Sequence, residues 1–283
     1  MPNAMIMLRP RFLFSIHTPA LLLAGSLLFA TSSCGILGPD DGSGEPDSGE
    51  VTILFLGSSY LDSFDVPDRV KGFAREAGKG VFIRSRLIPG LYLDHFAQEP
   101  QTTAMIRERA WDYVVLQGGS QNAAYPMGSG HSVSMALREL HRKATELSPD
   151  TKVVYMMPWA FEDGMTWIEG RDETYEIMQL DIRENTLRWA EDMDLVVAPV
   201  GMAFYQVLTT WDPPEHYLHL SDWNHASHRG AYLAAATIYS TVFGESVTEV
   251  NYRWTLDVDL ARDFREVAST TVMDSLSLWR ITP

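Results

Sequence analysis

The sequence holds a single cysteine, Cys34, among its 283 residues, so no disulfide can form within the chain. Basic residues are also scarce. The chain has 22 lysines and arginines against 37 aspartates and glutamates, which gives a formal net charge of −15. Such a charge repels phosphate backbones and anionic lipid headgroups, so nucleic acid is excluded as a partner on electrostatic grounds.

Several catalytic and binding motifs are missing as well. No G-x-G-x-x-G follows a strand-like run and no G-x-x-x-x-G-K-[ST] occurs, so the chain has no nucleotide-binding motif. The H-E-x-x-H of zinc proteases is absent, and so is the G-x-S-x-G turn of the α/β-hydrolases. Any hydrolytic site must therefore be built from other patterns.

The N-terminus has the features of an export signal. Residues 1–11 carry only positive charge, and an apolar run follows over residues 12–30, densest at 20–30. That dense part is shorter than the roughly 20 residues of a membrane span. The small residues 31–33 and Cys34 resemble a bacterial lipobox, although Thr31 replaces the usual leucine. The resemblance implies a lipoprotein signal peptide at 1–33, acylation of Cys34 and anchoring in the cell envelope. The alternative is an ordinary signal peptide cleaved nearby, with Cys34 incidental.

Residues 34–50 are small, turn-prone or acidic, and they hold little that could form a core. We expect them to be a flexible tether. The folded part is then residues 51–283, a usual size for one α/β domain.

Short apolar runs alternate with helix-like segments along this domain. The runs predict buried strands at residues 51–56, 81–88, 113–117, 152–157 and 195–200. The segments between and after them predict helices at residues 66–77, 101–109, 132–147, 173–192 and 227–243. This alternation favours a flavodoxin-like, doubly wound parallel sheet of five strands in three α/β/α layers, with functional residues on loops after the strands' carboxyl ends.

Two such loops carry residues suited to nucleophilic catalysis. Gly57-Ser58-Ser59 follows the first strand, and Ser59 stands near the start of the next helical stretch. Asp222 and His225 lie three residues apart just before the last predicted helix, so the carboxylate can orient the imidazole. A base held in this way is what a weakly acidic serine hydroxyl needs. Gly-Ser-Ser alone is equally typical of a helix cap.

The D-x-x-H at 222–225, followed by x-S-x-x-G-x-Y-L-A-A, resembles the closing block of the SGNH hydrolases, the GDSL-type esterases. Residues 53–60 resemble their opening block, in a subgroup that reads G-N-S-F-T, with Ser59 in the nucleophile's place. The resemblance implies a serine esterase of the SGNH fold with the triad Ser59, Asp222 and His225. It implies no cofactor.

The same resemblance implies an oxyanion hole. Residues 87–91 match the glycine block, in which Gly90 offers its backbone N–H together with that of Ser59. The usual G-x-N-D after the third strand is replaced by Gln117-Gly-Gly-Ser-Gln-Asn122. Gln117 and Asn122 are both candidate side-chain donors, and Gln117 is favoured because it ends the strand. Gln-Gly with a nearby asparagine also resembles carbohydrate acetylesterases, which suggests O-acetyl groups on carbohydrate as the substrate.

Two other readings compete with the esterase. His216, His219, Asp222 and His225 could form the ligand set of a metal-binding lipoprotein or metallohydrolase. His-x-x-His in a loop does not direct both rings to one ion, and no second carboxylate cluster is present, so this reading is the weaker one. A binding protein that keeps the fold without catalysis is the third class. The complete Ser59, Asp222 and His225 set argues against it.

Overall fold

The computed structural model describes residues 44–126, 132–168, 173–212 and 217–282. The predicted signal peptide, Cys34 and His216 lie outside these residues, so the predictions made for them stay predictions. Within the described residues, no helix is both long and apolar enough to span a bilayer.

Five parallel strands form the central sheet in the order β2-β1-β3-β4-β5, which confirms the predicted fold class. Their bounds are β1 Val51–Gly57, β2 Val81–Leu87, β3 Tyr113–Gln117, β4 Lys152–Met156 and β5 Val196–Ala198. Because β1 pairs with both β2 and β3, its carboxyl end lies beside the ends of two neighbouring strands.

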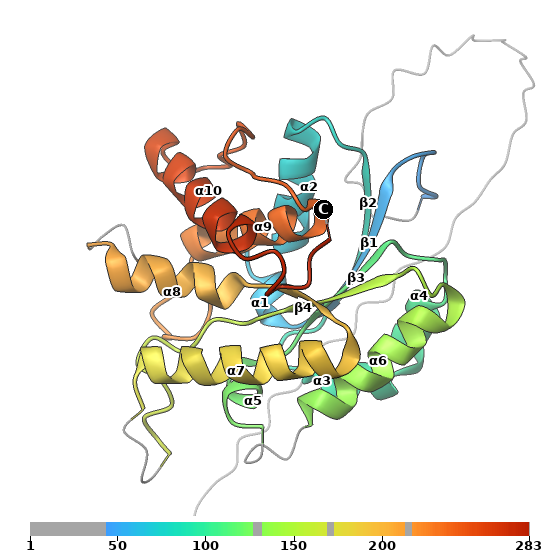
Figure 1. Ribbon diagram of the computed structural model, residues 1–283, viewed down its shortest axis with the longest axis horizontal. Coiled ribbons are helices and arrows are strands. Elements are labelled where there is room, and N and C mark those ends of the chain that lie inside the picture. Colours follow the sequence, from blue (N-terminus) through green and yellow to red (C-terminus); the bar gives the residue numbers. More distant parts are fainter. Residues whose placement is uncertain (1–43, 127–131, 169–172, 213–216, 283) are drawn as a thin grey trace, which may run out of the picture. The chain divides into compact units, whose positions relative to one another are not determined.

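Helices cover both faces of the sheet because side chains alternate along each strand (Figure 1). In β1, Ile53 and Phe55 belong to the core shared with α2 (Val66–Glu76), α8 (Val200–Thr210), α9 (His228–Phe243) and α10 (Val258–Met273). Leu54 and Leu56 belong to the opposite core, shared with α3 (Leu93–Gln98), α6 (Val133–Leu147) and α7 (Tyr175–Met193). Continuous burial of the strand therefore comes from two separate hydrophobic layers, as a doubly wound sheet requires.

The five predicted helices are present with small shifts at their ends. They are α2 Val66–Glu76, α4 Pro100–Ile106, α6 Val133–Leu147, α7 Tyr175–Met193 and α9 His228–Phe243. Five more were not predicted: α1 Ser59–Asp62, α3 Leu93–Gln98, α5 Ser120–Ala124, α8 Val200–Thr210 and α10 Val258–Met273. The short ones offer too few residues for a periodicity, and α10 is fixed by packing against α9.

The contact between α9 and α10 depends on one buried cation. The Arg265 guanidinium donates to the Tyr232 hydroxyl at 3.2 Å and to the Tyr252 carbonyl at 3.2 Å. Phe264 and Ala268 fill the same interface with apolar surface. Because α9 is enclosed by the sheet, α2 and α10, nearly all of its side chains are buried, and its N-terminus is held in a fixed place.

The predicted tether is not wholly separate from the domain. Residues 44–50 lie within the described structure, and Glu45 forms an ion pair with Arg109 at 3.3 Å. The Glu50 carboxylate accepts a hydrogen bond from the backbone N–H of Asp47 at 2.8 Å. Residues just before β1 therefore contact the domain.

The ion pair between Arg86 and Glu99 makes the stability of the fold depend on pH. Hydrogen bonds from the Arg86 guanidinium lower the pKa of Glu99 from its ordinary 4.5 to about 2. A carboxyl with a depressed folded-state pKa stabilises the fold above pH 4.5, and this contribution is lost as the pH falls toward 2. We therefore expect Glu99→Gln and Arg86→Met to flatten the loss of unfolding free energy on acidification. Urea titrations at a series of acidic pH values measure this, with Arg84→Met on the same strand as the control that keeps the wild-type slope.

Candidate active site

The first part of the site is the turn that follows β1. Gly57 lies so close to β3 that an added Cβ would stand 2.7 Å from Gln117 Oε1, which explains why glycine occupies this position. Ser58 follows with extended backbone angles as the N-cap residue, and α1 begins at Ser59. Ser59 is therefore the first helical residue after the central strand, as its place in the sequence predicts.

The second part is the loop that leads into α9. Residues 218–220 and 225–227 pair in antiparallel fashion, with Leu220 N–H donating to the His225 carbonyl and Ser227 N–H to the Leu218 carbonyl, each at 2.7 Å. The residues between form a tight turn closed by Asp222, whose Oδ1 accepts from the N–H groups of Asn224 at 3.1 Å and His225 at 3.0 Å. Ser227 caps α9. The loop is thus anchored at both ends.

Ser59, His225 and Asp222 are brought into one hydrogen-bonded row. His225 Nε2 lies 2.8 Å from Ser59 Oγ, and His225 Nδ1 lies 2.6 Å from Asp222 Oδ2. With a proton on Nδ1, the ring donates to the carboxylate and accepts from the serine hydroxyl. This is the geometry of a serine activated by a base that an acid holds in the productive tautomer.

The charge of Asp222 is favoured by its hydrogen bonds. Partial burial disfavours the carboxylate, but the hydrogen bonds from the ring and backbone of His225 and from the Asn224 N–H outweigh it, and the pKa of Asp222 is lowered. The carboxylate therefore stays ionised under mildly acidic conditions and remains able to hold the imidazole. Its side chain is 49% exposed, so solvent shares in this stabilisation.

A buried tyrosine next to the serine connects the two parts of the site. The Tyr60 hydroxyl donates to Asn224 Oδ1, which lies in the turn between Asp222 and His225. Ser120 Oγ lies 2.8 Å from the same hydroxyl. The Tyr60 ring stacks on Trp159 at 4.4 Å, and Trp159 Nε1–H donates to the Asn224 carbonyl at 2.8 Å. Burial raises the pKa of Tyr60, so the hydroxyl keeps its proton.

The sequence prediction included neither Tyr60 nor Asn224. Tyr60 directly follows the proposed nucleophile, and Asn224 lies inside the D-x-x-H block, so proximity to both motifs was the signal available. Trp159 completes this contact, because it is fully buried between Tyr60 and Phe204.

Replacing Tyr60 by phenylalanine tests whether this contact positions the histidine loop. The variant leaves Asn224 Oδ1 without its donor, while the Ser120 hydroxyl keeps the Trp159 carbonyl as acceptor, and the expected cost is about 1–3 kcal/mol in unfolding free energy. We expect kcat to fall about tenfold with KM nearly unchanged, because the loop loosens without losing a catalytic group. Tyr155→Phe is the matched control, since the buried Tyr155 hydroxyl has no protein partner among the described residues. Equal effects of the two variants would contradict a positioning role.

Gln117 has a different environment from the one predicted. Its Oε1 accepts from the Ser58 N–H at 2.7 Å and lies 3.2 Å from Ser58 Oγ, while its Nε2 donates to the Gly118 carbonyl at 2.8 Å. The side chain is 1% exposed. The prediction that Gln117 is an oxyanion donor is therefore corrected: its amide is buried and holds the turn before the serine.

Asn122, the alternative donor, lies in α5 and is also buried. Its Oδ1 approaches the backbone at Gly119, and its Nδ2 has no protein partner within the described residues. Its amide is enclosed by protein rather than open to a substrate. Both predicted side-chain donors are thus buried.

The structural role of Gln117 predicts a stability effect. In Gln117→Leu the buried Ser58 N–H loses its acceptor, which we expect to cost about 1–3 kcal/mol in unfolding free energy. The turn before Ser59 loosens at the same time, so activity should fall with stability. Urea unfolding measures the first effect, and Gln121→Leu on exposed surface serves as the control. A Gln117→Leu protein as stable as wild type would refute this role.

The backbone donors proposed for the oxyanion lie at the same edge of the sheet. Gly57 in β1 is paired with Leu87 in β2, so the chain segments that continue to Ser59 and Gly90 leave the sheet side by side. Gly90 has φ +76°, a conformation that glycine adopts readily, and it is exposed. Among the described residues, neither the Ser59 N–H nor the Gly90 N–H has a protein acceptor.

Within the described residues, the histidines near this loop do not converge as metal ligands. Both ring nitrogens of His225 face Ser59 and Asp222, and His219 Nε2 lies 2.9 Å from the Ala160 carbonyl. Burial lowers the pKa of His219, which favours its neutral form. Considering only described residues, no three histidine, cysteine, aspartate or glutamate side chains gather as an ion would require. His216 lies outside them.

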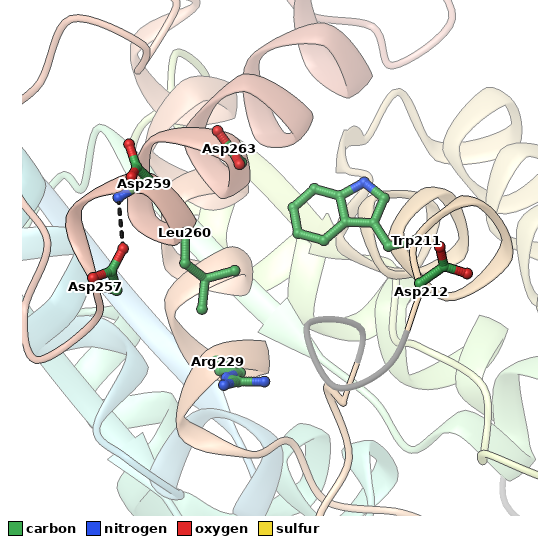
Figure 2. Close-up of a pocket in the computed structure, with 7 residues that line it drawn as sticks. All are labelled: Trp211, Asp212, Arg229, Asp257, Asp259, Leu260 and Asp263. Carbon is green, nitrogen blue, oxygen red and sulfur yellow. Dashed lines mark hydrogen bonds between the residues drawn. The ribbon is translucent and has the colours of Figure 1, made fainter.

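A separate acidic cleft of about 500 Å³ lies between the end of α8 and the start of α10 (Figure 2). It holds no member of the row described above. Asp257 caps α10 by accepting from the Asp259 N–H at 2.9 Å, and Asp259 and Asp263 pair with Arg262. Capping of α10 and ion pairs within it therefore explain the presence of these three acidic residues.

No family model matches the chain, and no curated protein matches it in sequence. Solved structures do match in fold. A DUF4886 family protein from Bacteroides uniformis matches with a TM-score of 0.65 at 16% identity, covering 79% of this chain and 95% of that one. A putative SGNH hydrolase from Slackia heliotrinireducens matches with a TM-score of 0.55 at 23% identity, covering 68% and 98%.

A catalytic mutant of Axe2, an acetylxylan esterase from Geobacillus stearothermophilus, matches with a TM-score of 0.50 at 17% identity, covering 74% of this chain and 98% of that one. Together with the strand order, these likenesses show that the chain has the SGNH hydrolase fold. The fold predicted from the first and last sequence blocks is confirmed.

Proposed function

We propose that the chain is a serine esterase that hydrolyses O-acyl esters through an acyl-enzyme on Ser59. The observation that supports this most is the row of hydrogen bonds from Asp222 through His225 to Ser59, with N···O distances of 2.6 and 2.8 Å. Ser59 follows the carboxyl end of the first strand, and functional residues of doubly wound sheets usually lie at such strand ends, which supports the proposal.

In the proposed reaction, His225 Nε2 takes the proton of Ser59 Oγ as the oxygen attacks the ester carbonyl. Asp222 stabilises the imidazolium that forms. The backbone N–H groups of Ser59 and Gly90 donate to the oxyanion of the tetrahedral intermediate. The protonated His225 then protonates the departing alcohol, and a water molecule activated by the same ring releases the acid from Ser59. No cofactor takes part in these steps.

Covalent labelling tests this proposal directly. A fluorophosphonate reacts with serines whose hydroxyl is activated by a neighbouring base. We expect it to modify the wild-type chain on the peptide that contains Ser59, and to leave Ser59→Ala unlabelled. Hydrolysis of p-nitrophenyl acetate should stop in the same variant. Hydrolysis that survives Ser59→Ala but ends with a chelator would instead support the metallohydrolase.

The acyl group we propose is acetyl, and the alcohol a carbohydrate. Two observations support this proposal. One protein of similar fold is an acetylxylan esterase, and the site is open to solvent at the Asp222 loop. Release of acetate from acetylated xylo-oligosaccharides, measured beside release from p-nitrophenyl acetate, tests the proposal. A preference for long acyl chains would contradict it.

We also propose that the mature protein is anchored in the bacterial cell envelope by a lipid on Cys34. The basic and apolar segments before this residue support the proposal, and they lie outside the described structure. Cys34→Ser is expected to move the protein from the membrane fraction to the soluble fraction. Retention of Cys34→Ser in the membrane fraction would refute the anchor.

A further inference from the structure

A cleft of about 350 Å³ opens beside the catalytic row, on the side of Asp222. Its wall is shared with the site, because Asp222 and Asn224 both line it. The rest of the lining comes from the segment after β4 and from Trp223: Phe161, Asp163, Gly164, Thr166 and Trp167. The Glu162 N–H donates to the Trp223 carbonyl at 2.9 Å, so the two segments that form the cleft are joined.

Two tryptophans in this cleft are exposed, although tryptophan side chains are largely buried in most proteins. Trp167 and Trp223 are each 60% exposed. The Trp167 ring leans on Phe161 at 5.4 Å, which leaves much of its indole surface open. Burying one indole removes a large apolar area from water, so two exposed indoles in one cleft mark a binding surface.

The backbone at Trp223 strengthens this interpretation. Trp223 has φ +60°, a left-handed conformation that is costly for a bulky side chain. The conformation is maintained by the Trp223 N–H donating to the Leu220 carbonyl at 3.0 Å. Glycine would suit this position better for stability alone. The strain is therefore better explained by the indole than by the turn.

Apart from the Asn224 amide and the two indole N–H groups, the polar side chains of the cleft carry hydroxyl or carboxylate groups. Thr166 and Asp163 stand among the aromatic rings, and both also line an adjoining cavity of about 560 Å³ that adds Glu162, Glu173 and Glu176. Carboxylates accept hydrogen bonds from sugar hydroxyls and repel anions. The whole surface thus combines flat apolar faces with acceptors and a negative field.

We propose that this cleft is the subsite for the alcohol part of the ester, and that the alcohol is a neutral sugar chain. The apolar face of one pyranose ring stacks on Trp223 or Trp167, and its hydroxyls donate to Asp163. Uronic acid units are excluded by charge. The proposal rests on the proposed esterase function, because the cleft shares Asp222 and Asn224 with the catalytic row.

The experiment compares substrates in the full chain. Acetylated xylo-oligosaccharides are the neutral probe, acetylated oligogalacturonides the anionic probe, and p-nitrophenyl octanoate the probe for an acyl chain in the cleft. Each kcat/KM is divided by that for p-nitrophenyl acetate, so that differences in active fraction cancel. The variants are Trp223→Gly and Trp167→Ala. Trp211→Ala, which removes an indole from the separate acidic cleft of Figure 2, is the control.

We expect each cleft variant to lower the ratio for the xylo-oligosaccharide roughly three- to tenfold, as loss of one aromatic stack predicts. Trp211→Ala should leave that ratio unchanged. Trp223→Gly should melt at or above the wild-type temperature, because glycine relieves the left-handed strain. A stable variant with lost selectivity separates a binding role from a structural one.

Three results would overturn the proposal. The ratio for the xylo-oligosaccharide could be unaffected by both variants, the octanoate ratio could fall in its place, or the oligogalacturonide could be hydrolysed as well as the neutral probe. If the wild-type chain hydrolyses no ester, the esterase fails separately. Calorimetric titration of xylo-oligosaccharide into the wild-type chain and Trp223→Gly then still decides the subsite, since only the wild-type chain should bind.

Discussion

His225→Ala is expected to lower kcat/KM for p-nitrophenyl acetate by roughly 10⁴- to 10⁶-fold, the range found when a member of a serine triad is removed. The reason is that this one ring transfers the proton both when the acyl-enzyme forms and when water releases it. Its Nε2 lies 2.8 Å from Ser59 Oγ and, in the part of the chain that the structure describes, is the one base in contact with that hydroxyl. Without it, the serine must lose its proton to water, which is a far weaker acceptor at neutral pH.

The same argument predicts strong non-additivity. Ser59→Ala removes the nucleophile that His225 serves, so Ser59→Ala/His225→Ala should be no slower than the slower single variant. Initial rates with p-nitrophenyl acetate measure all three, and His141→Ala on α6 controls for the loss of an imidazole. Effects of the two changes that multiply would contradict a shared step, and would require His225 to act on something other than Ser59.

Asp222→Asn is expected to have the second largest effect, a fall of roughly 10²- to 10⁴-fold in kcat at neutral pH. The turn should survive, because the amide oxygen can still accept from the N–H groups of Asn224 and His225. The amide nitrogen, however, replaces Oδ2 opposite His225 Nδ1. It donates to that nitrogen and places the ring proton on Nε2, where the ring can no longer accept from Ser59.

Several measurements distinguish this tautomer effect from a loss of structure. We expect the melting temperature and KM of Asp222→Asn to stay near their wild-type values while kcat falls. The pKa of Asp222 is lowered in the fold, so the wild-type carboxylate remains charged, and wild-type activity should not drop through its protonation under mildly acidic conditions. Asp259→Asn, on the surface of α10, is the isosteric control. Normal activity in Asp222→Asn would show that His225 needs no acid partner.

The architecture could be predicted because strands buried on both faces leave a continuous apolar pattern. Each of the five strands was located in this way, and their alternation with helices implied a parallel sheet. The helices α3, α5 and α8 were missed for the opposite reason. They are short or apolar around much of their surface, so no 3.6-residue period distinguishes them, and α10 depends on Arg265 and Phe264 packing against α9.

The candidate site residues divide in the same way, into those that a local sequence pattern predicts and those that it does not. Asp222 and His225 are three residues apart, so their contact is a local property that spacing alone predicts, and the structure places them 2.6 Å apart. Gln117 and Asn122 were interpreted from their position after a strand. Which direction each amide faces depends on Ser58, Gly118 and the packing of α5, and no local pattern encodes those contacts.

The sequence by itself therefore determined the five strands and the Asp222–His225 pair, because each depends on neighbours a few residues away, and it determined the acidic charge, because that depends on composition alone. Only the tertiary structure decided that Ser59 meets His225 across 166 positions, that Gln117 is buried under the turn, and that Trp167 and Trp223 face solvent while Trp159 does not. Burial and hydrogen-bond partners are set by contacts between distant segments, and these exist only once the sheet has formed.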